Sequence, residues 1–192
     1  VVFLASCSMA PREEPTSTDK VHWAQHAKEV ALIEDWQIEG KIGIRSQNEG
    51  GSAYVNWKQS GGSFHITLSG PLGQGTSIIS GDPGSARLDS SEGSFISDSP
   101  EKLIYEHTRW QVPVRYLLYW IKGLATPDLT ITNITYNQLG LIKSLQQGLW
   151  KLQFDNYKNA MDTVLPYRLK VLTDNYKATI VIKSWSKTNL ET

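Results

Sequence analysis

The chain has 192 residues, about one domain's length, and its 19 basic and 19 acidic side chains leave no formal net charge. This balance argues against nucleic acid as a partner, because a nucleic-acid-binding domain usually carries a basic excess. A single cysteine excludes an intramolecular disulfide and the paired thiolates of a structural zinc site. We therefore expect one domain, present as a monomer.

The first segment in chain order is an apolar run that ends at the only cysteine. Small residues precede Cys7 in Leu4-Ala5-Ser6-Cys7, as at the cleavage site of a secretion signal. We expect residues 1–6 to be the end of a signal peptide, and Cys7, by its resemblance to a bacterial lipobox, to carry a lipid. The alternative is an incidental or buried cysteine in a secreted protein. Residues 7–18 would be a polar tether with a reach of roughly 18 Å.

A helix and a β-meander are predicted next. Trp23, Ala27 and Val30 recur at helical spacing, which predicts an amphipathic helix over 19–34. From Trp36 the period changes to two, and the alternation continues to Arg45 as a strand. Two further strands, separated by glycine-containing turns, are predicted at 53–58 and 64–68.

The rest of the chain is predicted to be strands with two helices between them. Prolines at 100 and 113 begin the predicted helices, the second of which is closed by Gly123. The fold class is mainly β with α: a curved antiparallel sheet forms an incomplete, open β-barrel that encloses helices or is capped by them. One domain is expected over 19–187, with 188–192 as a C-terminal tail. The remaining strands are predicted at 76–80, 85–89, 93–97, 129–136, 138–145, 149–157, 165–173 and 176–185.

Known catalytic and metal-binding patterns are not found in the sequence. His22 and His26 are four residues apart on the predicted helix, but the HExxH pattern and a third ligand are missing. No GxSxG nucleophile elbow occurs. We therefore expect a protein that is not an enzyme and that needs neither a metal nor another cofactor.

Large apolar side chains occupy one face of several predicted strands and helices. Ordinary core packing is one explanation for them. A sheet curved around a few short helices, however, leaves part of its concave face uncovered, and such a cavity suits an acyl chain. The candidate cavity residues are Trp36, Ile38, Ile42, Ile44, Val55, Trp57, Phe64, Ile66, Leu68, Leu117, Trp120, Trp150, Leu152 and Phe154.

An apolar residue is also predicted at a loop tip. Pro71 and Gly73 favour the first corner and the exit of a turn, which places Leu72 at its tip. Such a leucine is either exposed to solvent or folded back onto the sheet.

These features together resemble the LolB family of outer-membrane lipoproteins. The resemblance rests on Leu4–Cys7, Trp36-Gln37, Trp57-Lys58-Gln59, Leu68–Gly73 and the helix from Val112 to Leu124. The chain departs from the family at Leu118, where a polar or basic residue is expected. It also departs at the helix exit, which is Gly-Leu-Ala-Thr-Pro instead of a tighter Gly-Leu-Pro.

The resemblance implies a lipid-anchored protein of the outer membrane that faces the periplasm. Such a protein accepts acylated lipoproteins from the periplasmic carrier LolA and releases them into the inner leaflet, without nucleotide energy, with Pro71, Leu72 and Gly73 as the membrane-insertion loop. Three alternatives remain open: a soluble lipoprotein carrier of the same fold, a lipid-anchored structural subunit of an envelope assembly machine, and an envelope hydrolase.

Overall fold

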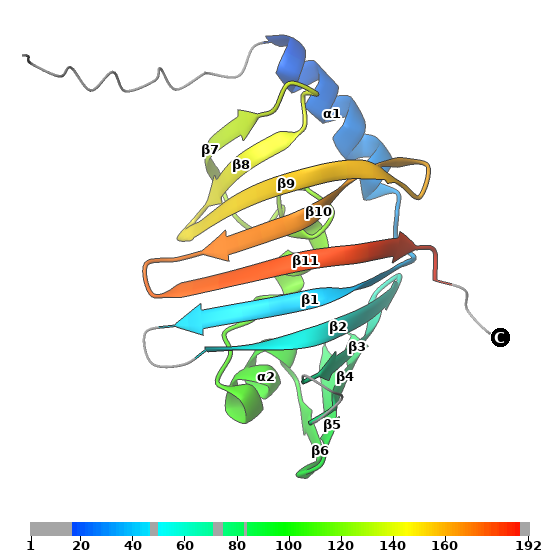
Figure 1. The fold of residues 1–192 in the computed structure, drawn as a ribbon, viewed down its shortest axis with the longest axis vertical. Coiled ribbons are helices and arrows are strands. Elements are labelled where there is room, and N and C mark those ends of the chain that lie inside the picture. Colours follow the sequence, from blue (N-terminus) through cyan, green and yellow to red (C-terminus); the bar gives the residue numbers. More distant parts are fainter. Residues whose placement is uncertain (1–16, 47–49, 71–74, 83, 189–192) are drawn as a thin grey trace, which may run out of the picture.

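The computed structural model describes residues 17–46, 50–70, 75–82 and 84–188. Its strands form one antiparallel sheet in the order β6-β5-β4-β3-β2-β1-β11-β10-β9-β8-β7, so the first and last strands of the chain pair in the middle and the sheet stays open (Figure 1). The helices are α1 (Ser17–Ala31), α2 (Pro100–Thr108) and α3 (Val114–Trp120). The strands are β1 (Trp36–Ser46), β2 (Gly50–Ser60), β3 (Ser63–Ser69), β4 (Ser77–Asp82), β5 (Ser85–Ser90), β6 (Gly93–Ser97), β7 (Ile131–Tyr136), β8 (Ile142–Gln147), β9 (Trp150–Ala160), β10 (Thr163–Leu172) and β11 (Tyr176–Ser186).

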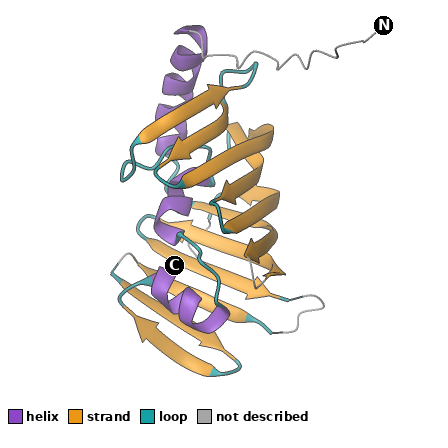
Figure 2. Ribbon diagram, turned by 90° about the vertical axis from the view of Figure 1, so that its left-hand side faces the viewer, coloured by secondary structure: helices purple, strands orange, loops and turns teal. Residues whose placement is uncertain are grey.

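The predicted fold class is confirmed, because the open sheet curves around the helices, which lie on its concave side (Figure 2). Alternation along the strands explains which face is buried. In β1, Ile38 and Ile42 are buried while Lys41 and Arg45 are exposed. The apolar face of the sheet therefore meets the helices, and the polar face forms the convex outer surface.

Several predicted boundaries differ from the observed ones, as three elements show. The first helix ends at Ala31, not at 34, and the third is limited to 114–120. The strand predicted at 138–145 begins only at Ile142, because Asn137 forms a turn in which its Oδ1 accepts hydrogen bonds from the backbone N–H groups of Leu139 and Leu141, at 2.9 and 3.0 Å. Asparagine favours such local bonding over sheet pairing.

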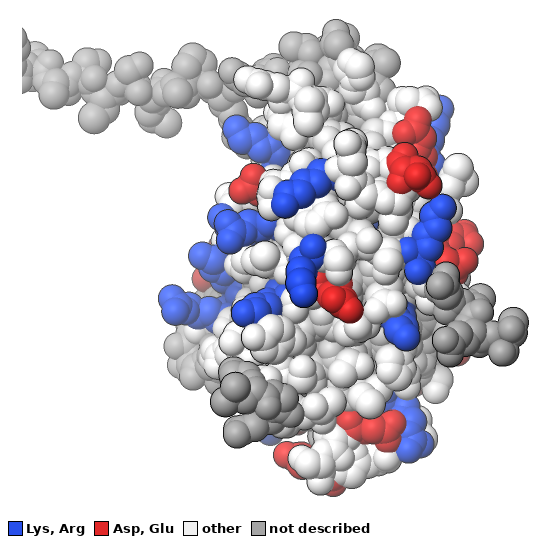
Figure 3. Space-filling view, turned by 45° about the vertical axis from the view of Figure 1, so that its right-hand side comes forward, with Lys and Arg blue, Asp and Glu red and all other residues white. Residues whose placement is uncertain are grey.

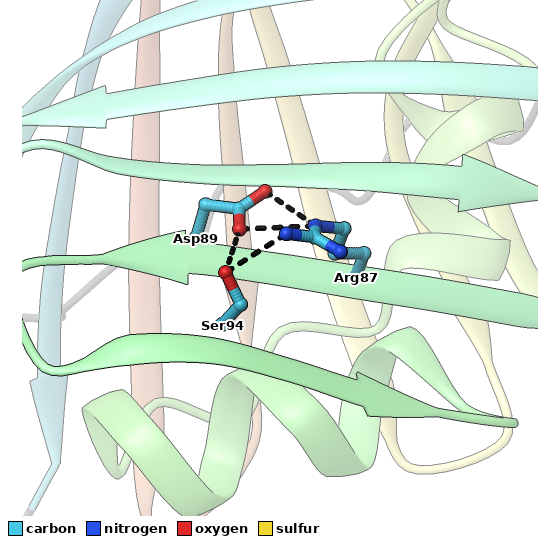
Figure 4. A network of polar contacts seen from close by, with 3 residues as sticks. All are labelled: Arg87, Asp89 and Ser94. Atoms are coloured by element: carbon cyan, nitrogen blue, oxygen red, sulfur yellow. Dashed lines mark hydrogen bonds and ion pairs between the residues drawn. The ribbon is translucent and has the colours of Figure 1, made fainter.

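Polar contacts hold the edge of the sheet at β5 and β6 (Figure 4). Arg87 Nε donates to Asp89 Oδ2 at 2.8 Å, and the Ser94 hydroxyl also donates to Asp89. Hydrogen bonds from Arg87 and Ser94 lower the pKa of the Asp89 carboxyl below its ordinary value. Both side chains are accessible to solvent, with exposed fractions of 51% and 38%, so the pair neutralises charge at a sheet edge more than it stabilises the fold.

Helix α1 covers the β7 end of the sheet, where Trp23 stacks on Tyr136 with ring centroids 6.2 Å apart. Its connection to β1 is held by Lys122, whose Nζ donates to the carbonyl of Ile33 at 2.9 Å. None of the helices in the described part of the chain is both long and apolar enough to cross a membrane.

The packing of α1 predicts a pH-dependent stability. Burial lowers the pKa of His26, against a smaller opposing effect of Glu29, and its Nε2 is buried without a hydrogen-bond partner among the described residues. Below about pH 6.5 the unfolded chain therefore binds a proton at this histidine before the folded chain does. The free energy of unfolding should consequently decrease as the pH falls from 6.5 towards the folded-state pKa.

This dependence can be measured by urea unfolding at pH 7.5 and 5.5. The His26→Gln variant should lose less stability between these two pH values than the parent chain does. The His22→Gln variant is the matched control, because His22 lies on the same helix and is exposed. An equal loss of stability in His26→Gln and in the parent chain would show that His26 does not cause the pH dependence.

Candidate functional site

An apolar pocket lies between the concave face of the sheet and the helical segment behind it. Strands β1, β2, β3, β4 and β11 form its wall, while α2, α3 and the connection between them form what we call the cover. All of its lining residues are apolar: Ile38, Ile42, Val55, Trp57, Ile66, Leu68, Ile79 and Ile180 in the wall, and Ile104, Trp110, Val112, Val114 and Leu117 in the cover.

The free space inside the pocket is small in this conformation. It holds about 40 Å³ of free space, room for a few water-sized groups and not for a long acyl chain. Because its lining offers no polar partners, water is not stabilised inside it. A larger apolar guest therefore requires the cover to move away from the sheet.

The connection between α2 and α3 carries the aromatic part of the cover. Helix α2 ends at Arg109, which adopts the left-handed conformation with φ 60° and turns the chain back towards the sheet. Trp110 then lies directly on the backbone of β2: a Cβ added to Gly51 would be 2.9 Å from its Cζ2. Glycine at position 51 therefore allows the indole to close the pocket at this end of the strand.

The two cover helices are tied to each other by a single side chain. Glu101 Oε1 accepts a hydrogen bond from the backbone N–H of Arg115 at 2.9 Å. Thr108 ties the connection to the end of α2, since its hydroxyl donates to the carbonyl of Ile104 at 2.7 Å and accepts from the N–H of Trp110 at 3.1 Å. These bonds are few and none of them is fully buried, so the cover is held chiefly by apolar packing.

Half of the cavity candidates from the sequence meet in this pocket. They come from three consecutive strands and one helix, which the sheet brings together although they are up to 79 positions apart. The candidates that line it are Ile38, Ile42, Val55, Trp57, Ile66, Leu68 and Leu117.

The other half do not line it. Trp36 packs between Trp57 and Trp185, with ring centroids 5.2 and 5.5 Å away. Trp120 packs on Trp150 at 5.7 Å, under the β8–β9 side of the sheet. In this conformation Trp36 and Trp120 belong to the core, as do Ile44, Phe64, Leu152 and Phe154, while Trp150 is partly buried against it.

Sequence reasoning did not assign six of the lining residues to the cavity. Ile79 and Ile180 follow the same alternation as their assigned neighbours, so the pattern contained a signal for them. For the cover residues, the only signals in the sequence were their helical spacing and the position of Trp110 between two predicted helices. The six are Ile79, Ile104, Trp110, Val112, Val114 and Ile180.

A buried glutamine, also not singled out from the sequence, fixes the segment after α3. The Gln147 side chain has no exposed surface. Its Oε1 accepts from Trp120 Nε1 at 2.9 Å and from the N–H of Thr126 at 3.0 Å, and its Nε2 donates to the carbonyls of Thr126 and Leu129 at 2.8 and 2.7 Å. One side chain thus anchors α3 and the following loop to β8.

Two predicted sites lie outside the described residues: the lipid-attachment residue Cys7 and the loop Pro71, Leu72 and Gly73. In the described ranges, no group of three or more histidine, cysteine or acidic side chains could hold a metal ion.

Sequence comparison identifies relatives over nearly the whole chain. A protein of Stutzerimonas stutzeri named outer-membrane lipoprotein LolB is 35% identical, covering 98% of this chain and 93% of its own length. One of Pseudomonas syringae with the same name is 34% identical over 99% of this chain and 94% of its own length. One of Pseudomonas aeruginosa is 34% identical over 90% and 84%.

Solved structures share the fold at low sequence identity. A LolA-superfamily protein of Nitrosomonas europaea superimposes with a TM-score of 0.56 at 8% identity, covering 90% of this chain and 94% of its own. A DUF1329-family protein of Desulfovibrio piger gives 0.51 at 9% identity, covering 94% and 96%. The sequence model of the family described as "Outer membrane lipoprotein LolB" matches residues 34–185. This chain, with its open sheet and apolar pocket, belongs to the LolB family of outer-membrane lipoproteins.

Proposed function

We propose that this protein accepts acylated lipoproteins from the periplasmic carrier LolA and releases them into the inner leaflet of the outer membrane. Membership of the LolB family establishes a role in outer-membrane lipoprotein localisation. The hand-over and the release are inferred from the apolar pocket. The pocket is the observation that carries the proposal, because an acyl chain cannot cross the periplasm without an apolar site to shield it.

The chemistry of the lining suits an acyl chain. Each methylene group removed from water contributes about 0.8 kcal/mol, and a lining without polar groups has no desolvation penalty of its own. The gain from burying an acyl chain offsets the loss of contacts between the cover and the sheet. Opening of the cover and entry of the chain are therefore expected to be coupled.

Transfer would follow a gradient of affinity. A site that binds acyl chains more tightly than the carrier does, but less tightly than the bilayer, moves cargo in one direction without a nucleotide. The proposed lipid on Cys7 would serve as a tether that keeps the domain beside the membrane receiving the cargo.

The direct test is reconstitution. An acylated lipoprotein bound to purified LolA is mixed with liposomes, with and without this protein, and the cargo that floats with the liposomes is measured. The protein should increase the rate of transfer, and a lipoprotein lacking its acyl chains, mixed with LolA in the same way, should not respond. Equal transfer with and without the protein would refute the proposal.

The predicted loop tip provides a separate test of release. Leu72→Glu should leave cargo acceptance unchanged and reduce delivery to liposomes at least about tenfold, because a carboxylate enters the bilayer interface poorly compared with leucine. Ser69→Glu, on the preceding strand, is the control. Normal delivery by Leu72→Glu would remove Leu72 from the release step.

A further inference from the structure

One end of the strands combines an exposed apolar tip with a row of basic side chains. We call this end the basic rim and define it by Leu149, Lys151, Leu172, Lys177 and Arg45. The first lies in the β8–β9 turn, and the others lie at adjacent ends of β9, β10, β11 and β1, on the left in Figure 1.

The apolar tip is Leu149, whose exposed fraction is 84%. It occupies the second corner of a two-residue turn between the paired residues Gln147 and Trp150. Gly148, with φ 54°, supplies the positive φ that the first corner needs. Ile131, 40% exposed, is paired with Gln147 beside this turn. A short turn therefore holds a leucine in water next to a second apolar side chain.

The basic residues form a row across the sheet. Strand register pairs Lys151 with Leu172, Leu172 with Lys177, and Lys177 with Arg45. With strands spaced about 4.8 Å apart, the row is about 15 Å long. All three cationic residues are exposed.

The cationic surface extends from this row over the convex face. On β10, Lys170 and Arg168 lie two and four positions from Leu172. On β1, Lys41 lies four positions from Arg45. Acidic residues interrupt this surface: Asp155 is paired with Arg168, Glu39 lies two positions beyond Lys41 on β1, and Asp174, in the turn beside the row, lies 3.8 Å from Lys151. Figure 3 shows lysine and arginine side chains gathered along the left-hand side of the surface. The chain is neutral as a whole, so this is a local concentration of positive charge.

We propose that the basic rim docks the protein onto the surface of a bilayer containing anionic phospholipids, with Leu149 in the interface and the row of cations at the headgroup phosphates. The inference rests on the proposed release of cargo into a membrane and names the surface that approaches it. Cations beside an exposed apolar side chain are the combination that binds anionic interfaces. No residue of the segment 71–74 is needed for it.

The position of the pocket supports a membrane as the occupant. Arg45 pairs with Gly50, which is the neighbour of Gly51, on which the Trp110 ring of the cover lies. The rim and the aromatic side of the cover are therefore at the same end of β2. Docking at the rim would bring the Trp110 side of the cover to the bilayer into which the cargo is released.

Vesicle binding without cargo tests the inference. The full chain carrying Cys7→Ala, which has no lipid attachment site, is mixed with phosphatidylethanolamine vesicles with and without phosphatidylglycerol, and the bound fraction is measured by flotation at low salt. Replacing Arg45, Lys151 and Lys177 together by glutamine should lower partitioning onto the anionic vesicles about 100-fold. Leu149→Glu should lower it about tenfold.

Matched variants change the same residue types elsewhere. Leu139→Glu alters a leucine that is 65% exposed in the turn at the other end of β8. The triple replacement of Lys58, Lys143 and Lys183 by glutamine removes three exposed cations away from the rim. Both controls should bind vesicles like the parent chain.

Two results would overturn the inference: equal partitioning of rim and control variants, or equal binding of the parent chain to vesicles with and without phosphatidylglycerol. Binding of acylated lipoprotein is measured separately for each variant. If the parent chain binds no lipoprotein, the proposed function fails, whereas the vesicle experiment still decides the role of the rim.

Discussion

The Trp57→Asp variant is expected to lose binding of acylated lipoprotein, with the affinity falling at least about 100-fold. Trp57 is 3% exposed and lines the wall of the pocket. A carboxylate at this position either remains unpaired in an apolar wall or takes up a proton, and both cost free energy when an acyl chain excludes water from it. A penalty of about 3 kcal/mol corresponds to about 100-fold in affinity. Titration with a fluorescently labelled acylated lipoprotein measures the change.

Two further variants separate pocket chemistry from loss of the fold. Lys58→Asp introduces the same carboxylate at the neighbouring position, which is exposed on the convex face, and should bind cargo normally. Trp57 also stacks on Trp36, so its loss weakens the core as well. Leu68→Glu avoids this, because Leu68 lines the pocket yet is only partly buried. A folded Leu68→Glu protein with unchanged affinity would show that this pocket does not hold the acyl chain.

The largest effect on stability is expected at Gln147. The Gln147→Leu variant should lower the free energy of unfolding by about 4 kcal/mol, because each buried polar group left without a partner costs about 1–3 kcal/mol. The groups concerned are Trp120 Nε1, the N–H and carbonyl of Thr126, and the carbonyl of Leu129. Denaturant unfolding followed by tryptophan fluorescence measures the loss.

Gln146→Leu is the matched control for this variant. Gln146 is the preceding residue on β8, its side chain points to the opposite face, and it is only partly buried. Its replacement should change stability by less than about 0.5 kcal/mol. A loss below about 1 kcal/mol in Gln147→Leu would mean that the segment after α3 is held by apolar packing instead of this hydrogen-bond network.

The small free volume of the pocket also indicates how cargo would enter. The side chains of the cover come from a short helix, a connection and another short helix, while the wall belongs to a continuous hydrogen-bonded sheet. Moving the cover breaks few hydrogen bonds, whereas moving the wall would break the strand ladders. The cover is therefore the element expected to move, with Trp110 and Val112 leaving the sheet first because they lie on the connection and are only half-buried.

The strands of the central sheet were predictable because their burial alternates residue by residue. In β1 the period-two pattern from Trp36 to Ile44 identifies the strand and its buried face. The turn at Asn137 was missed because a side-chain oxygen bonding to its own backbone competes with strand pairing. Such local competition leaves no trace in hydrophobic periodicity.

The pocket and the basic rim were likewise only partly predictable from the sequence. The apolar faces indicated a lipid-binding cavity, but they did not separate Trp57, which lines the pocket, from Trp36, which packs between Trp57 and Trp185 and does not line it. Both lie on the same face of the sheet, and only the placement of the cover decides which of them meets free space. The overall charge is zero and gave no sign of the basic rim. Its cations lie at positions 45, 151 and 177, and only strand pairing brings them together.

The sequence by itself determined the fold class, the buried face of the strands with clear alternation such as β1, and the family, because these depend on local periodicity and on short motifs. Tertiary structure alone decided that the pocket has little free space, that Gln147 anchors the segment after α3 and that Arg45, Lys151 and Lys177 stand in one row. Each of these depends on strand register and on contacts between residues distant in the chain, which periodicity along a single strand does not specify.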